Sequence, residues 1–181
     1  SFAIVGLPDL AVSESRERVR SAIRNSGVDF PRLKVTVNLA PADLRKQGPS
    51  YDLPIAISVL AVSGKIPLSR ELRQGLFVGE LALSGAVRPV TGVLSTALAA
   101  RRAGFATLFV PDANAAETTL VPGLDVRPVR RLDQLIEHLK GRTPIDTAEA
   151  MDYDFSAASS LADFSSIRGQ ESAKRALEIA A

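Results

Sequence analysis

The sequence contains no cysteine and only one histidine, His138, among its 181 residues. The absence of cysteine excludes disulfide bonds and thiolate metal sites, and it favours a reducing, cytoplasmic location. A single histidine excludes a metal centre built from several histidines, so no metal-binding residue is predicted. His138 lies beside Glu137 and Lys140 on a predicted polar helix, and we therefore expect it to be a solvated surface residue.

Long apolar runs, net charge and aromatic residues are also scarce. The longest apolar stretches, such as residues 53–62, are far shorter than the ~20 residues of a membrane span, so no membrane association is expected. A net charge of +2 is too small to predict nucleic-acid binding by itself. The chain has 181 residues, of which 46% are apolar, and this size and composition indicate one well-buried domain plus a tail.

Apolar spacing and turn residues divide the chain into alternating helices and strands. Helices are predicted at residues 10–25, 53–63, 70–74, 94–103 and 132–139. Strands are predicted at residues 2–5, 33–39, 76–83, 87–90, 107–110 and 126–129, with a hairpin turn at Ser84-Gly85 and a loop or helical turn around residues 114–117. This mixture of hairpins and crossover units predicts an α+β or α/β sandwich.

After residue 140 the sequence becomes polar, small and irregular. Residues 141–163 are predicted to be a linker, and an amphipathic helix is predicted to begin near Gln170. We therefore expect a domain over residues 1–140 and the start of a second one over residues 164–181. Because the chain begins in a strand-like run and stops inside a helical pattern, we expect a fragment of a longer polypeptide that lacks the first strands of its domain.

A Gly48-Pro49-Ser50 turn that opens an apolar helix is the most informative motif. With Phe77-Val78-Gly79-Glu80-Leu81 and Ser84-Gly85-Ala86-Val87-Arg88-Pro89-Val90, it resembles the proteolytic domain of Lon. Residues 35–46 and Tyr51-Asp52-Leu53-Pro54 are more similar to the Lon-like domain that opens the magnesium-chelatase-like AAA+ ATPases of the ComM/YifB family. The resemblance covers residues 2–140, and the tail from residue 164 resembles the beginning of that family's ATPase module.

The resemblance implies an α+β fold like domain 2 of ribosomal protein S5, followed by a linker and the first helix of an AAA+ module. For the full-length protein it implies ATP and magnesium as cofactors and assembly into a ring, which is expected to be a hexamer. It further implies work on DNA, as a helicase or branch-migration motor in transformation and recombination. For the fragment itself, no cofactor and no enzymatic activity are expected.

Ser50 matches the Lon nucleophile, but Leu94 occupies the position where the resemblance places a lysine. A Ser/Lys dyad needs a neutral amine to accept the hydroxyl proton, and leucine has none. Lys46 is near in sequence, yet we expect it in an exposed polar loop. Ser50 or Asp52 is therefore predicted to cap the helix, and the domain is predicted to be non-proteolytic and to shape the ring or guide DNA or a partner. One alternative is an active peptidase using Ser50 and a displaced lysine, and a second is a module that recruits a recombination factor.

No G-x-x-x-x-G-K-[ST] phosphate-binding loop occurs in the chain. In the resembled family, a stretch like that at residues 167–170 borders the adenine pocket, which implies nucleotide contacts by Ile167, Gly169 and Gln170. The alternative is a frayed helix with nothing bound.

Three arginines, Arg16, Arg20 and Arg24, recur every four residues on the first predicted helix. Such a basic ridge is suited to contact the phosphates of DNA. A second cluster comprises Arg127, Arg130 and Arg131. The alternative is a solvated helix face on which Glu14 and Glu17 neutralise the arginines. Stacking of single-stranded bases is disfavoured, because only 5% of the residues are aromatic.

Overall fold

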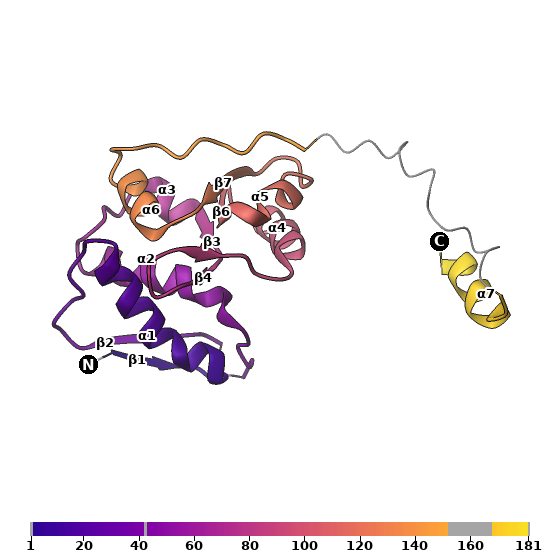
Figure 1. Cartoon of the computed structure of the whole chain (residues 1–181), viewed down its shortest axis with the longest axis horizontal. Coiled ribbons are helices and arrows are strands. Elements are labelled where there is room, and N and C mark those ends of the chain that lie inside the picture. Colours follow the sequence, from indigo (N-terminus) through magenta and orange to yellow (C-terminus); the bar gives the residue numbers. More distant parts are fainter. Residues whose placement is uncertain (1, 42, 152–167, 181) are drawn as a thin grey trace. The chain divides into compact units, whose positions relative to one another are not determined.

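The computed structural model describes residues 2–41, 43–151 and 168–180 of the chain. The chain divides into two units, Ser1–Met151 and Asp152–Ala181. The second unit is described through helix α7 (Glu171–Ala180) and the three residues before it. The predicted start of a helix near Gln170 is thereby confirmed. All remaining helices and strands of the described chain belong to the first unit (Figure 1).

The first unit begins with a parallel pair of strands, β1 (Phe2–Val5) and β2 (Val35–Asn38). Helix α1 (Leu10–Asn25) connects them, and its bounds are those that the apolar spacing predicts. The helix starts where it does because the Asp9 carboxylate accepts a hydrogen bond from the Val12 amide at 2.8 Å. This side chain satisfies one of the amides that the first turn of a helix leaves without a partner.

Helix α2 (Asp52–Val62) forms the centre of the unit and follows one turn of 3₁₀ helix, η1 (Pro49–Tyr51). It is buried on nearly all sides, as its continuous apolar sequence predicts, and only Ser58 and Val62 are exposed. Each fully buried aliphatic side chain contributes about 1.5–3 kcal/mol relative to exposure. The fold is therefore organised around α2.

A second parallel sheet has the strand order β3–β6–β7. Its central strand, β6, is buried at all five positions because it has a neighbour on each side and helices on its faces. Phe77 of β3 stacks on Phe109 of β6 with ring centroids 4.6 Å apart. The bounds are β3 (Gly75–Phe77), β6 (Thr107–Pro111) and β7 (Asp125–Val129), with helices α3 (Arg70–Gln74), α4 (Val93–Arg102), α5 (Asp112–Thr118) and α6 (Leu132–Leu139).

The predicted hairpin is present, but the long strand predicted at residues 76–83 is wrong. The chain leaves the sheet after β3, and β4 (Glu80–Leu81) pairs instead with β5 (Val87–Arg88) in an antiparallel ribbon. Gly79 causes the break, because its φ is 158° and a Cβ there would lie 2.9 Å from Val87. Only glycine fits such a position.

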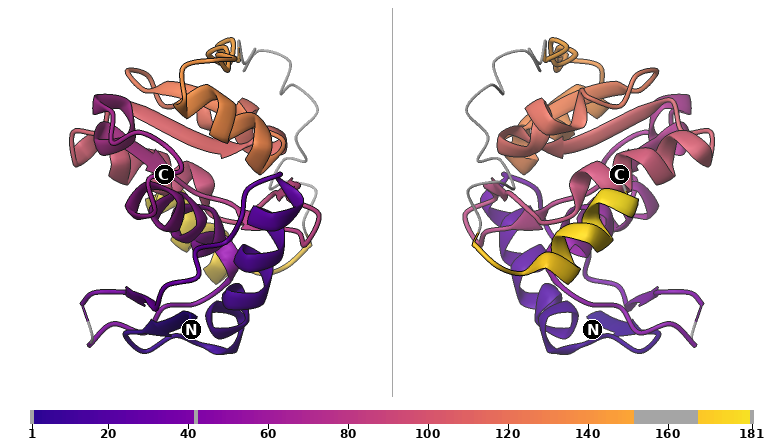
Figure 2. Two further views of the ribbon diagram at one scale, coloured as in Figure 1. Left: turned by 90° about the vertical axis from the view of Figure 1, so that its left-hand side faces the viewer. Right: turned by 90° about the vertical axis from the view of Figure 1, so that its right-hand side faces the viewer.

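The two parallel sheets lie at opposite ends of the first unit, with α1 and α2 between them (Figures 1 and 2). This arrangement is a mixed α/β structure with parallel sheets and one antiparallel ribbon, which is compatible with the predicted α+β class. Where a loop or helical turn was predicted around residues 114–117, the chain forms helix α5.

Candidate functional site

Ser50 lies half-buried in η1, at the corner where the chain enters α2. Two backbone hydrogen bonds fasten this corner to Gly79, one from the Gly79 amide to the Ser50 carbonyl at 3.2 Å and one from the Leu53 amide to the Gly79 carbonyl at 3.0 Å. The Ser50 hydroxyl makes no hydrogen bond to any other residue that the structure describes. These two bonds hold the backbone of Ser50 in place, whereas its hydroxyl has no hydrogen-bond partner among the described residues.

The predicted capping role of Ser50 and Asp52 is wrong. The N-cap position of η1 is Gly48 and that of α2 is Tyr51, and neither helix start has a capping side-chain hydrogen bond. The 3₁₀ turn runs directly into α2, so that Asp52 is already helical, and its carboxylate accepts hydrogen bonds from other elements.

Leu94 lies in the first turn of α4 with 37% of its surface exposed. Its side chain has no basic atom, so it cannot take a proton from a serine hydroxyl. Among residues 2–41, 43–151 and 168–180, no lysine forms a hydrogen bond with Ser50. The described part of the chain thus shows Ser50 without a basic partner.

The expectation that Lys46 lies in an exposed loop is wrong. Only 6% of its surface is accessible, and its ammonium donates hydrogen bonds to the carbonyl oxygens of Leu44, at 2.7 Å, and Pro41. A lysine can be buried when backbone carbonyls replace the water around its charge. This amine is committed to the loop that leads to η1, and it makes no hydrogen bond with Ser50.

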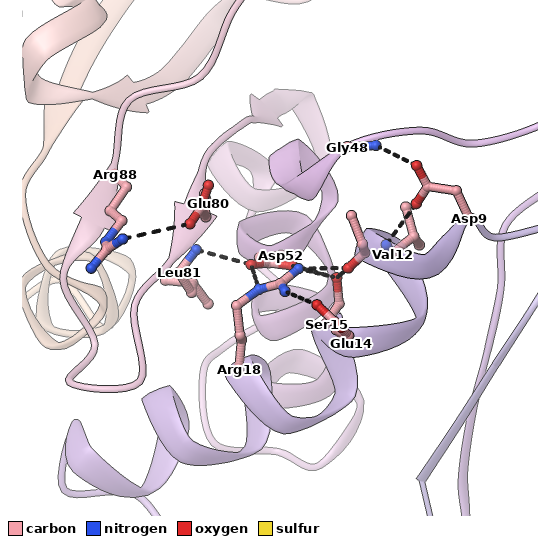
Figure 3. Close-up of polar contacts among 11 residues, drawn as sticks. Asp9, Val12, Glu14, Ser15, Arg18, Gly48, Asp52, Glu80, Leu81 and Arg88 are labelled. Atoms are coloured by element: carbon pink, nitrogen blue, oxygen red, sulfur yellow. Dashed lines mark hydrogen bonds and ion pairs between the residues drawn. The ribbon is translucent and has the colours of Figure 1, made fainter.

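The main polar cluster of the first unit surrounds Asp52, whose side chain is completely buried (Figure 3). Its carboxylate accepts hydrogen bonds from the Arg18 guanidinium at 2.6 and 3.0 Å, from the Leu81 amide at 3.1 Å, and from the Ser15 hydroxyl. We call Ser15, Arg18, Asp52 and Leu81 the Asp52 corner. It joins α1, α2 and β4 around one carboxylate.

The charge of the Asp52 corner is balanced inside the protein. The hydrogen bonds and charge of Asp52 raise the pKa of Arg18 above its ordinary value, although partial burial opposes the shift. Arg18 also donates to the Ala11 carbonyl at 2.7 Å and lies 3.7 Å from Glu14. Because every oxygen of the Asp52 carboxylate has a donor, the corner fixes α1 and α2 relative to one another and offers no free acid or base.

Sequence reasoning did not identify this corner. The available signals were an aspartate at the start of an otherwise apolar helix, and Ser15 and Arg18 three residues apart on α1. Residues three apart share one helix face, so both side chains reach the same partner.

The basic ridge on α1 is less open than its spacing predicts. Arg16 and Arg24 are exposed, but Arg20 is half-buried, with its guanidinium 5.3 Å from the centroid of the Phe30 ring. The Nε atom of Arg20 is buried and has no hydrogen-bond partner in the described chain. Arg20 therefore packs on an aromatic ring, and Arg16 and Arg24 are the two exposed arginines of the ridge.

The second basic cluster is neutralised by carboxylates. Each of its three arginines forms an ion pair, at 2.8, 3.1 and 3.1 Å. The pairs are Arg127 with Asp125, Arg130 with Asp112, and Arg131 with Asp133. This cluster is therefore a poor candidate for binding phosphate.

Residues 142–151, which we call the strap, lie against β7 and α6 although their sequence predicts the start of a linker. The Ala148 amide donates to the Val126 carbonyl at 2.8 Å, and the Thr147 hydroxyl donates to Asp125 at 2.6 Å. The Met151 amide donates to the Thr119 hydroxyl at 3.0 Å. These contacts attach the strap to the first unit, which extends to Met151.

His138 is an anchor of the strap, and the prediction that it is a solvated surface residue is wrong. It is 7% exposed and tilted against the Phe109 ring, with centroids 5.5 Å apart. The Ile145 amide donates to His138 Nδ1 at 2.9 Å, so this nitrogen is an acceptor. The proton of the neutral ring must then lie on Nε2, which donates to the Glu71 carboxylate at 2.9 Å.

The predicted nucleotide contacts lie in the second unit. Ile167 is outside the described residues, whereas Gly169 and Gln170 are exposed and lead into α7. In the described ranges no group of three histidine, cysteine or acidic residues is placed to hold a metal ion. Nor does any helix in those ranges have the length and apolar character required to cross a membrane.

Comparison with known proteins gives matches along nearly the whole chain. A family model described as subunit ChlI of Mg-chelatase matches residues 1–114. YifB from Salmonella typhimurium is 44% identical over 180 residues, which are 99% of this chain and 35% of that protein. The competence protein ComM from Haemophilus influenzae is 41% identical over 184 residues, with 99% of this chain and 36% of that protein covered.

A more distant match is the Lon protease of Azorhizobium caulinodans, 29% identical over 142 residues, which are 74% of this chain and 16% of that protease. The chain thus spans about a third of the length of the YifB and ComM proteins that it matches.

Proposed function

The chain belongs to the family of the Mg-chelatase subunit ChlI, and from this membership we propose that it is the non-proteolytic Lon-like domain of a ComM/YifB-type AAA+ ATPase. The observation that carries the proposal is the missing base. Ser50 has the sequence context of the Lon nucleophile, whereas Leu94 supplies an aliphatic side chain at the position of the lysine. The proposed fold is that of domain 2 of ribosomal protein S5.

The surroundings of Ser50 support this proposal. The nearest lysine in the sequence, Lys46, is held by backbone carbonyls, and the acid two residues after Ser50 is saturated by donors of the Asp52 corner. A nucleophilic serine needs a base that can take its proton and then return it. Lys46 instead binds carbonyls of the loop before η1, and Asp52 holds α1, α2 and β4 together.

We propose a structural role for this domain in the full-length protein. By the resemblance to ComM and YifB, that protein is an ATPase that uses ATP and magnesium, assembles as a ring and processes DNA during transformation or recombination. The domain shapes the ring or guides DNA or a protein partner into it. Gly169 and Gln170 would border the adenine site of the full-length protein.

Labelling with a fluorophosphonate probe tests the loss of peptidase activity. We expect no covalent adduct on Ser50 in the full-length protein, while a Lon protease treated in parallel provides the positive control. Stoichiometric labelling that disappears in Ser50→Ala would instead establish the peptidase alternative.

The DNA-guiding role is tested by charge reversal of the two exposed arginines on α1. In the full-length protein, we expect Arg16→Glu with Arg24→Glu to weaken binding to branched DNA in a gel shift and to reduce its salt dependence. Arg101→Glu with Arg102→Glu on α4 is the matched control, because it reverses two exposed arginines elsewhere. If the α1 variant bound branched DNA no more weakly than the α4 control, the α1 ridge would be only a solvated face. The result of the peptidase test would not be affected.

A further inference from the structure

The C-terminal end of α2 carries one exposed apolar side chain, although the helix is otherwise exposed only at Ser58. Val62, its last residue, has 78% of its surface accessible, and so does Leu33 in the loop before β2. Large aliphatic side chains exposed to this degree gain from burial against another chain. Both residues line the same small groove, which has a volume of about 290 Å³.

A second and larger groove, of about 370 Å³, lies on the other side of Val62. It is lined by α2, by Leu72 of α3 and by β3, and all its side chains are uncharged. Because Val62 contributes to both grooves, they form one continuous strip, which we call the α2 strip. It extends from β2, across the end of α2, to β3.

The α2 strip lies against β2 and β3, and each of these strands has one edge without a partner among the strands of the described chain. β3 is the terminal strand of the order β3–β6–β7, and β2 pairs with β1 alone among the strands of the described chain. Figure 1 shows α2 between these two sheets. A free edge beside an apolar groove can accept an extended segment, which forms backbone hydrogen bonds to the edge and inserts alternate side chains into the groove.

The charges around the α2 strip are positive. Lys34 lines the smaller groove, Lys65 follows the end of α2, and Arg73 lies one residue after Leu72 on α3, on another side of that helix. All three are exposed, and within the described residues none forms an ion pair with a carboxylate. The acidic residue of α3, Glu71, is engaged with His138. No acidic side chain lines either groove.

From this geometry we propose that the α2 strip binds an extended segment of a partner protein in which apolar and acidic residues alternate. The segment adds as a strand to the free edge of β3. Its apolar side chains enter the larger groove and cover Val62, and its carboxylates face Lys34 and Lys65. The strip is a recognition surface separate from Ser50 and from the exposed arginines of α1.

The test uses the full-length protein and a short fluorescein-labelled peptide in which leucine and glutamate alternate. We expect saturable binding by fluorescence anisotropy, and a peptide of alternating leucine and lysine should bind at least about tenfold more weakly. The backbone amides of Gly75–Phe77 that lack a partner should become protected from hydrogen exchange when the acidic peptide is bound.

Two surface variants locate the binding, and a third controls for exposed apolar surface in general. Val62→Gln and Lys34→Glu should each weaken binding about tenfold, and Lys34→Glu should also reduce its salt dependence. Leu83→Gln, at an exposed leucine on the hairpin turn, should leave binding unchanged. All three positions are exposed, so the variants are expected to fold normally.

Several results would overturn the proposal. They are absence of peptide binding, equal binding of the lysine peptide, and equal binding by Val62→Gln. Self-association that is lost in Val62→Gln, measured by sedimentation without any peptide binding, would assign the strip to a second copy of the chain instead.

Discussion

The Asp52 corner and the strap hold chain segments by the same kinds of hydrogen bond, but water reaches them to different degrees. In the Asp52 corner the side chains of Asp52 and Arg18 are 0% and 18% exposed, whereas those of Asp125 and Arg127, the ion pair beside the strap, are 31% and 22% exposed. A buried charge that loses its partner cannot be rehydrated, and an exposed one can. Burial, more than the number of bonds, should therefore decide which contacts the fold depends on.

Asp52→Asn should have the largest effect of the changes considered. It removes a completely buried carboxylate, so the Leu81 amide and the half-buried Arg18 guanidinium lose their charged acceptor and only the exposed Glu14 remains near Arg18. We therefore expect about 3–5 kcal/mol lower free energy of unfolding. Urea denaturation measures this loss. The double variant Asp52→Leu with Arg18→Leu removes both charges and should recover at least half of it. If the free energy of unfolding of Asp52→Asn were within about 1 kcal/mol of the parent value, burial would not determine which contacts the fold depends on.

His138→Phe should rank second. Phenylalanine preserves much of the ring packing on Phe109 but leaves the buried Ile145 amide without an acceptor, at a cost of about 1–3 kcal/mol. Hydrogen exchange should accelerate at the Ile145 and Ala148 amides and remain unchanged at the Leu81 amide of the Asp52 corner. Uniform acceleration at all three amides would show that the strap and the corner unfold together.

The strap should respond to acid through Asp125. Burial raises the pKa of this carboxyl, but hydrogen bonds from Arg127 and Thr147 outweigh that effect and hold it below its ordinary value. Its contribution to stability is thus complete above the unfolded pKa of about 3.9 and is lost as the pH falls through the folded pKa. Amide NMR signals of Thr147 and Ala148 should move in this range at low pH. In Asp125→Asn, the movement should be absent.

The smallest effect is expected at the exposed pair of Arg88 and Glu80, whose charged atoms are 4.0 Å apart. Arg88 is 63% exposed, so Arg88→Ala should change the free energy of unfolding by less than about 0.5 kcal/mol. Thermal denaturation at low and high salt checks this value. If Arg88→Ala lowered the free energy of unfolding as much as Asp52→Asn, the exposure of an ion pair would not predict its contribution to stability.

The local parts of the fold could be predicted from the sequence. Helices α1, α3 and α6 have the predicted bounds, because their apolar spacing, caps and terminating glycines act within a few residues. The break at Gly79 in the strand expected at residues 76–83 could not be predicted, since the backbone of Gly79 bonds to Ser50 and Leu53, far away in the sequence.

The polar residues were harder to predict than the helices. His138 sits among Glu137 and Lys140, a pattern typical of a solvated face, but its position is determined by Glu71 and Ile145. Likewise, Asp52 depends on Arg18, which lies 34 residues earlier. Such partners leave no periodic signal in a single sequence. Ser50 and Leu94 were recognisable only through the resemblance to Lon. That the domain lacks peptidase activity stays a prediction.

The burial of Lys46 has a consequence for chemical labelling. Acylating reagents attack amines that solvent reaches, so Lys34 and Lys65 should react first while Lys46 stays protected by the carbonyls of Leu44 and Pro41. Its modification would report that the loop before η1 has opened. Acylation of Lys46, detected by mass spectrometry, therefore reports on the conformation of the segment that leads to Ser50.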